Sequence, residues 1–131
     1  MVSRRIRKVN MNLEIQGDEV ISILKNENSL LDVSLISFTC SQSDDGMHLE
    51  MVFCARNNAF YKKAKLKFSG IVEFGFYYSN KYVFYNIESI KLLRCEDGLY
   101  YLSLDPDEEN SAASSSDQNF VKSKKIILTL D

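Results

Sequence analysis

The sequence is poor in cysteine and histidine, the residues that form disulfides in small folds or bind metal ions. Three cysteines and a single histidine occur among its 131 residues. Cys40, Cys54 and Cys95 form no C-x-x-C pair, so they indicate neither a secreted disulfide framework nor a zinc cluster. There is no run of about 18 apolar residues, and residues 1–10 contain no apolar secretory core. We therefore expect a reduced, cytoplasmic protein with no membrane partner, no metal and no other cofactor.

Catalytic signatures are equally scarce. The sequence contains no glycine-rich phosphate loop, no H-E-x-x-H and no G-x-S-x-G. His48 is the one histidine, and nothing in the sequence marks a nucleophile or an orienting acid for it. We therefore expect no catalytic residues and interpret the chain as a protein that is not an enzyme.

Charge is close to balanced overall but unevenly distributed. Sixteen Lys and Arg residues face eighteen Asp and Glu residues, which gives a net charge of -2. Residues 1–10 hold Arg4, Arg5, Arg7 and Lys8 and no acid, so the remainder is clearly acidic. We interpret residues 1–10 as a solvated basic segment. An acidic body argues against a general polyanion binder.

After residue 30, apolar and polar residues alternate with the two-residue period of a β-strand. A turn over residues 43–46 predicts a first hairpin. Its rungs pair Gln42 with Met47 and then match apolar residues, namely Cys40 with Leu49, Phe38 with Met51 and Ile36 with Phe53. This register makes Cys40 a small core residue, and Cys95 is interpreted in the same way.

A second hairpin is predicted with its turn at Ser79 and Asn80. Its rungs would pair Phe76 with Val83, Phe74 with Tyr85 and Val72 with Ile87. Gly70 and Gly75 within its first strand predict a bulge or a strong bend that curls the sheet.

A third hairpin is predicted at the Asp97-Gly98 turn, with Leu93 and Cys95 opposite Leu102 and Tyr100. A last strand over residues 124–130 would place Ile126, Leu128 and Leu130 on one face. The only helix signal covers residues 18–26, where two acids precede Val20, Ile21 and Leu24. The chain is therefore predicted to be one domain, residues 1–131, of the mainly β (α+β) class. We expect a curved, largely antiparallel sheet of six to eight strands with one short N-terminal helix.

Residues 107–119 form a polar, acidic segment without a single large apolar residue, which predicts a solvated loop. Asp105, Asp107 and Glu109 share the spacing that opens a calcium loop, but Asn110 and Ser116 replace its glycine and its bidentate glutamate. An alternative use of the segment is a carboxylate cluster that meets a basic partner protein.

A basic patch lies near two aromatic residues, Phe60 and Tyr61. Its lysines are Lys62, Lys63, Lys65 and Lys67. Such a patch is suited to stacking and neutralising single-stranded nucleic acid, although it is also typical of the wet face of a sheet. Tyrosines on both faces of the second hairpin, among them Tyr77 and Tyr82, indicate either a second covering layer or an interaction surface.

Residues 87–130 carry a resemblance to a known class. IESIKLLRCEDGLYYLSLDPDEE, followed after a polar gap by DQNFVKSKKIILTL, resembles small immunity proteins of contact-dependent growth inhibition and related polymorphic toxin systems. The resemblance implies a cytosolic inhibitor that blocks the active site of one cognate toxin domain, often a nuclease. The class has no shared binding motif, so no site residue follows from it.

The leading hypothesis is therefore an immunity protein that presents an acidic, tyrosine-bearing surface to a basic toxin. The residues expected to contact the toxin are Asp105, Asp107, Glu108, Glu109, Asp117, Tyr77 and Tyr82. The alternative is a single-stranded nucleic-acid-binding β-domain that uses Lys62, Lys63, Lys65 and Lys67.

Overall fold

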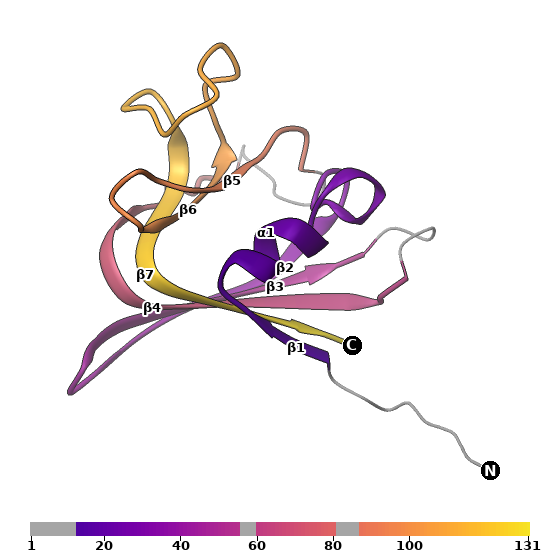
Figure 1. The fold of residues 1–131 in the computed structure, drawn as a ribbon, viewed down its shortest axis with the longest axis horizontal. Helices are drawn as coiled ribbons and strands as arrows, with labels where there is room; N and C mark the ends of the chain where they lie inside the picture. Colours follow the sequence, from indigo (N-terminus) through magenta and orange to yellow (C-terminus); the bar gives the residue numbers. More distant parts are fainter. Residues whose placement is uncertain (1–12, 56–59, 81–86) are drawn as a thin grey trace.

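The computed structural model describes residues 13–55, 60–80 and 87–131. These residues form an open, curled antiparallel sheet of seven strands (Figure 1). Its order is β2-β3-β4-β7-β6-β5, and β1 also pairs with β7. The strands are β1 (Leu13–Gln16), β2 (Ser34–Ser43), β3 (Gly46–Cys54), β4 (Lys63–Gly75), β5 (Lys91–Arg94), β6 (Tyr100–Asp105) and β7 (Gln118–Leu130). The predicted fold class is confirmed.

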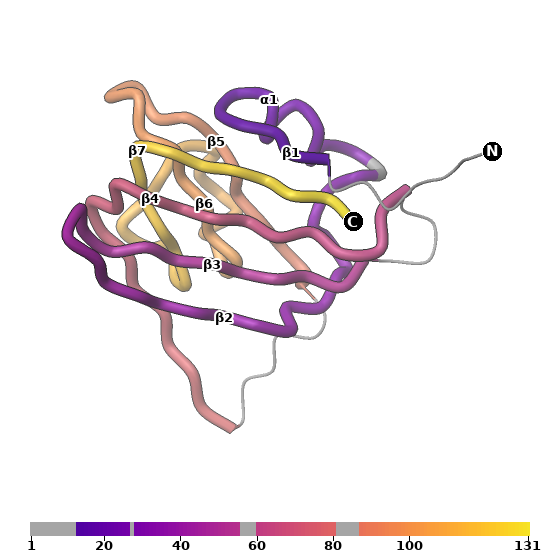
Figure 2. Tube along the Cα trace, turned by 90° about the horizontal axis from the view of Figure 1, so that it is seen from below, coloured from indigo at the N-terminus to yellow at the C-terminus, as the bar shows by residue number. Residues whose placement is uncertain are grey.

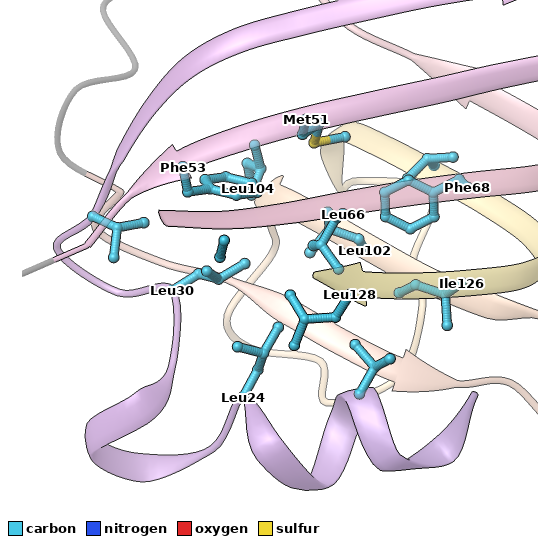
Figure 3. Close-up of a cluster of buried hydrophobic side chains, with 14 of the residues drawn as sticks. Leu24, Leu30, Met51, Phe53, Leu66, Phe68, Leu102, Leu104, Ile126 and Leu128 are labelled. Atoms are coloured by element: carbon cyan, nitrogen blue, oxygen red, sulfur yellow. The ribbon is translucent and has the colours of Figure 1, made fainter. Parts of the chain in front are cut away.

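The short helix α1 (Asp18–Ile23) and a 3-10 turn (Asn26–Asn28) follow β1. The helix begins at the predicted residue but ends three residues early. The backbone leaves the helical region at Leu24, where ψ is 52°, and Asn26 has a positive φ of 54°, so a right-handed helix does not continue through these residues. Val20 and Leu24 are buried against the sheet, so the apolar face predicted for this helix does reach the core (Figure 3).

Strand β7 pairs with three other strands of the sheet. It pairs with β4 from Phe120 to Leu130, while its other edge pairs first with β6 and then with β1. The predicted apolar face of Ile126, Leu128 and Leu130 is buried as expected. The strand begins at Gln118, inside the segment predicted as a loop, because its first residues are polar and hide the strand pattern.

The core lies on the inner faces of β3, β4, β6 and β7 and is closed by α1 and by the segment after it. Figure 3 shows side chains from these elements meeting in one cluster. Its labelled members are Leu24, Leu30, Met51, Phe53, Leu66, Phe68, Leu102, Leu104, Ile126 and Leu128. Such dry, close-packed clusters supply most of the free energy of folding.

The first hairpin is largely as predicted. Gln42 pairs with Met47, Cys40 with Leu49 and Phe38 with Met51. The pairing of Ile36 with Phe53 is wrong, because a bulge between Leu35 and Ser37 puts Leu35 opposite Phe53. Cys40 is exposed rather than a core residue, since β2 is an edge strand. Cys95 is only partly buried.

Only one predicted rung of the second hairpin lies within the described residues, and it is wrong. Ile87 exchanges backbone hydrogen bonds with Asp32 and Val33 rather than pairing with Val72, which is exposed at a register shift between Ile71 and Glu73. The predicted irregularity thus lies two residues from Gly70. The predicted partners Val83 and Tyr85 lie outside the described residues.

The third hairpin turns where predicted, but its register is wrong by one residue. Leu93 pairs with Tyr101, and the Cys95 amide bonds to the Leu99 carbonyl across a three-residue loop. Gly98 closes this loop with a φ of 86°, the left-handed conformation that such loops require. The shift puts Lys91 opposite the buried Ser103, on the face of β5 and β6 that points away from the main core.

Two adjacent isoleucines on β7 test this assignment of faces. Ile126 is fully buried, whereas Ile127 is half-buried on the opposite face of the sheet. We expect Ile126→Ala to lower the free energy of unfolding by about 2–5 kcal/mol. Ile127→Ala should cost less than half as much in the same urea titration. Equal losses would contradict the orientation of β7.

Candidate protein-binding site on the 106–117 loop

The loop over residues 106–117 connects β6 to β7 and folds back over the β5–β6 hairpin (Figure 1). Five consecutive residues of β6, from Tyr100 to Leu104, are buried. Tyr100, Leu102 and Leu104 belong to the main core, while the alternate side chains of Tyr101 and Ser103 point to the other face. The loop therefore acts as a second layer that buries this outer face.

The Asp117 carboxylate organises the loop, and its side chain has no exposed area. Oδ1 accepts hydrogen bonds from Lys91 Nζ at 2.8 Å and from the Asp107 amide at 2.8 Å. Oδ2 accepts from the Tyr101 hydroxyl at 2.7 Å and from the Ser114 amide at 2.9 Å. One carboxylate thus ties both ends of the loop to β5 and β6.

The electrostatics of Asp117 follow from these contacts. Burial by itself would raise the pKa of the Asp117 carboxyl, but the hydrogen bonds from Lys91, Tyr101 and the two amides outweigh it and lower the pKa to about 2. Burial, and then the bond to Asp117, raise the pKa of the Tyr101 hydroxyl. At neutral pH Asp117 is therefore a carboxylate and Tyr101 a neutral phenol.

Lys91 fastens the middle of the loop as well. Its ammonium donates a 2.6 Å hydrogen bond to the Ala112 carbonyl in addition to its bonds to Asp117. The Lys91 side chain is 8% exposed, so its charge is compensated inside the protein rather than by water. Sequence reasoning missed Lys91, because the predicted register of the third hairpin placed it on the wrong face.

The remaining carboxylates of the loop face outward to different degrees. Glu108 and Glu109 are exposed, and Asp105 and Asp107 are half-buried. Asp107 accepts the Glu109 amide at 3.1 Å and so shapes the local turn. Asp117, which was predicted to contact a partner, is buried, and its carboxylate bonds to Lys91, to Tyr101 and to two loop amides within the chain.

Two hollows flank the loop where it crosses β5. One, of about 440 Å³, is bordered by Leu93, Pro106 and Glu108. The other, of about 680 Å³, is bordered by Arg94, Asp97 and Lys122. Both are shallow and open, which suits contact with another surface better than enclosure of a small molecule.

The predicted tyrosines are placed only in part. Tyr77 is 66% exposed, and its amide donates a 2.8 Å hydrogen bond to the Asn119 side chain, two residues after Asp117. Tyr77 is thus attached to the base of the loop. Tyr82 lies outside the described residues.

The structure exposes the lysines of the basic patch but buries one of its two aromatic residues. Lys62, Lys63, Lys65 and Lys67 are all exposed, and the last three occupy the outward face of β4. Tyr61 is buried, with its hydroxyl bonded to the Asn28 carbonyl at 3.2 Å, so it is not available to stack on a base. Phe60 stays exposed.

His48 lies at the end of the β2–β3 hairpin with Ser43 and Asp45. Both partners contact the same ring nitrogen, with Ser43 Oγ and Asp45 Oδ1 each 3.0 Å from Nε2. Within the described part of the chain, the buried Nδ1 has no hydrogen-bond partner. A Ser-His-Asp relay needs the acid and the nucleophile on opposite nitrogens, so this cluster does not match one.

Comparisons of the chain with protein-family models, with curated proteins and with solved structures give no match. In residues 13–55, 60–80 and 87–131, no three His, Cys, Asp or Glu side chains gather as a metal site requires. None of the helices in these ranges has the length and apolar character needed to cross a membrane. The assignment of function therefore depends on the geometry of the loop.

Replacing Asp117 tests whether it organises the loop. Asp117→Asn leaves the buried Lys91 ammonium without a counter-charge, and we expect the free energy of unfolding to fall by about 3–5 kcal/mol. Asp107→Asn, which disturbs one exposed turn contact, should cost about 1 kcal/mol or less. Adding Lys91→Met to Asp117→Asn should restore part of the loss. Urea titrations of Asp117→Asn, Lys91→Met and the double variant measure this coupling. If the loss in the double variant equals the sum of the losses in the two single variants, Asp117 and Lys91 are not a coupled pair.

The same carboxylate predicts an acid-dependent loss of stability. Its pKa is about 2 in the folded chain against an ordinary value of 3.8, equivalent to roughly 2 kcal/mol. Because the folded pKa is the lower one, this stabilisation is complete above about pH 4 and is lost as the pH falls towards 2. The difference in stability between the native chain and Asp117→Asn should therefore shrink over this window. A constant difference would exclude titration of Asp117.

Proposed function

We propose that the chain is a non-enzymatic immunity protein that neutralises a basic toxin domain through the 106–117 loop. The observation that carries the proposal is the anchoring of this acidic loop by the buried Asp117 carboxylate. The anchored loop presents Glu108 and Glu109 to solvent on a defined backbone. The resemblance of residues 87–130 to immunity proteins supports the same role.

Anchoring of the loop favours tight binding. Ordering a free loop when it binds costs about 1–2 kcal/mol for each backbone residue that becomes fixed. Folding already orders much of this loop, through the Lys91–Asp117 pair and the amide bonds of Asp107 and Ser114. The free energy of contact with a partner is then available for affinity.

The charges on the loop suit a partner that handles phosphate groups. A nuclease cleft is basic, and carboxylates can occupy the positions that substrate phosphates take in it. Asp107, Glu108 and Glu109 are consecutive in the sequence, so they supply a local negative field on a chain whose net charge is already -2. Exposed Tyr77 at the base of the loop is suited to anchoring the complex.

The partner can be sought by co-expression. The carboxy-terminal domain of a secreted protein encoded directly upstream would be produced with and without this chain. We expect this domain alone to arrest growth, and the chain to restore growth and to co-purify with it. Restored growth without a complex, or turnover of a substrate by the chain alone, would overturn the proposal.

Charge reversal tests the role of the loop once the partner is in hand. Glu108→Lys with Glu109→Lys should slow association with the toxin domain at least about tenfold at low salt, and high salt should reduce this difference. The matched control is Glu14→Lys with Glu19→Lys, which makes the same charge change at exposed positions on β1 and α1. Surface plasmon resonance at two salt concentrations measures both rates. Equal slowing by the two double variants would show that only net charge matters.

Nucleic-acid binding is the second candidate, because Lys63, Lys65 and Lys67 form an exposed row on β4. Burial of Tyr61 weakens this alternative, since it removes one of the two predicted stacking rings. Titration of a labelled single strand at two salt concentrations distinguishes the two functions. Binding that weakens steeply with salt and is lost on Lys65→Glu with Lys67→Glu would favour the alternative.

A further inference from the structure

The hollow of about 440 Å³ beside β5, called the β5 hollow below, has two unlike walls. One wall is the chain over residues 89–93, which runs into β5. The other wall belongs to the 106–117 loop and consists of Pro106, Glu108, Asn110 and Ser111. The hollow therefore lies at the side of the loop that carries the exposed carboxylates.

Leu93 gives the β5 hollow an apolar surface that the core does not use. Its neighbour Leu92 packs against the main core, and side chains alternate along a strand. Leu93 therefore points to the opposite face, where it lies across from Tyr101 of β6 and stays half-buried. Pro106 on the loop wall is half-buried as well. The alkyl part of a long side chain can leave water between these two residues.

The charge in the β5 hollow is a single uncompensated carboxylate. Lys91 and Glu108 are the charged residues that border it. The Lys91 ammonium already bonds to Asp117 and to the Ala112 carbonyl, so its charge is compensated beneath the loop. Glu108 is exposed, and among the described residues it forms no ion pair. The hollow thus presents a carboxylate that can accept a cation.

The second hollow beside the loop differs in its charge. It is bordered by Arg94 and Lys122 but also by Glu96 and Asp97. Lys122 lies 3.8 Å from Asp97, and Arg94 pairs with Asp18 at 3.1 Å. Charges of both signs balance there, so that hollow selects neither a cation nor an anion. Of these two hollows, the β5 hollow is the one that is complementary to a cation.

The loop backbone holds Glu108 in place at the β5 hollow. The amide of the preceding Asp107 bonds to the Asp117 carboxylate at 2.8 Å. The amide of the following Glu109 bonds to Asp107 Oδ1 at 3.1 Å, and Pro106 has the fixed φ of its ring. A carboxylate on a fixed backbone loses less conformational entropy when it binds.

We propose that the β5 hollow is the subsite for one arginine side chain of the toxin domain. Its alkyl stem lies between Leu93 and Pro106, and its guanidinium donates two parallel hydrogen bonds to the Glu108 carboxylate. Arginine fits better than lysine, because the planar guanidinium is less strongly hydrated and pairs with a carboxylate in a bidentate manner. Arginine is also enriched among the residues that dominate binding at protein interfaces. This inference rests on the proposed function and specifies one contact within it.

The subsite can be tested on the free chain by NMR titration with a blocked Gly-Arg-Gly peptide. The peptide should shift the Leu93 methyl signals with a dissociation constant of about 1–10 mM, as one side chain in a shallow site allows. Leu35 on β2 is the internal control, because β2 lies at the opposite border of the sheet (Figure 2), and its methyl signals should not move. A citrulline peptide, which has the same shape without the charge, should bind at least about fivefold more weakly. A lysine peptide should bind at least about threefold more weakly.

Two adjacent carboxylates provide a matched pair of variants. Glu108→Gln should weaken binding of the arginine peptide at least about tenfold, since it removes the charge that the guanidinium contacts. Glu109→Gln is the same change at an exposed neighbour that does not border the β5 hollow, and it should change binding less than about twofold. Leu93→Ala should weaken binding at least about threefold through the lost contact with the alkyl stem. Circular dichroism checks that each variant is folded.

The same pair of variants tests the subsite in the complex. Glu108→Gln should speed dissociation of the toxin domain at least about fivefold, whereas Glu109→Gln should change it less than about twofold. Equal effects of the two variants on dissociation would overturn the assignment of the subsite to the toxin.

The outcomes separate this inference from the proposed function. The subsite is overturned if roughly 20 mM arginine peptide leaves the Leu93 signals unmoved, or if the citrulline or lysine peptide binds as tightly as the arginine peptide. It is also overturned if both glutamine variants bind the arginine peptide equally. These results concern the free chain, so a toxin domain that is still neutralised would leave the proposed function standing. Binding of the arginine peptide without neutralisation of any toxin would overturn the proposed function and the toxin as the source of the arginine.

Discussion

The burial of the Asp117 carboxylate against the Lys91 ammonium is the interaction on which the site depends. A buried ion pair gains little over two apolar side chains of the same size, because both charges lose their hydration. Its value here lies in geometry. The carboxylate accepts five hydrogen bonds, two of them from loop amides and two from Lys91, so a polar segment with few apolar contacts has one preferred conformation.

The sheet provides the framework for this pair. Strand β7 connects three other strands, and β6 is buried on both faces, by the main core on one side and by the loop on the other. Ser103 of β6 is also tied to β7, since its hydroxyl donates a 2.6 Å hydrogen bond to the Gln118 carbonyl where β7 begins. Folding of β5, β6 and β7 therefore brings Lys91, Tyr101 and Asp117 together before any partner is present.

Much of the fold could be predicted from alternation and turn residues. These signals gave the antiparallel class, the first hairpin and the apolar face of β7, because local sequence determines each of them. Partners distant in sequence could not be assigned. Nothing near Val72 indicates that Ile87 instead pairs with Asp32 and Val33.

The site was predictable only in its outline. The composition of residues 107–119 marked an acidic loop, but it did not distinguish the buried Asp117 from the exposed Glu108 and Glu109. That difference arises from Lys91, which lies beneath the loop because the register of the β5–β6 hairpin is one residue away from the predicted one. A lysine that compensates a carboxylate 26 positions away leaves no local pattern in the sequence.

The central claim is that the loop is fixed in the free protein, before it meets a partner. Amide hydrogen exchange in the isolated chain measures this most directly. The amides of Asp107 and Ser114, which bond to Asp117, should exchange far more slowly than the amide of the neighbouring exposed Ser115. Exchange of all three at the rate of an unstructured peptide would contradict the account.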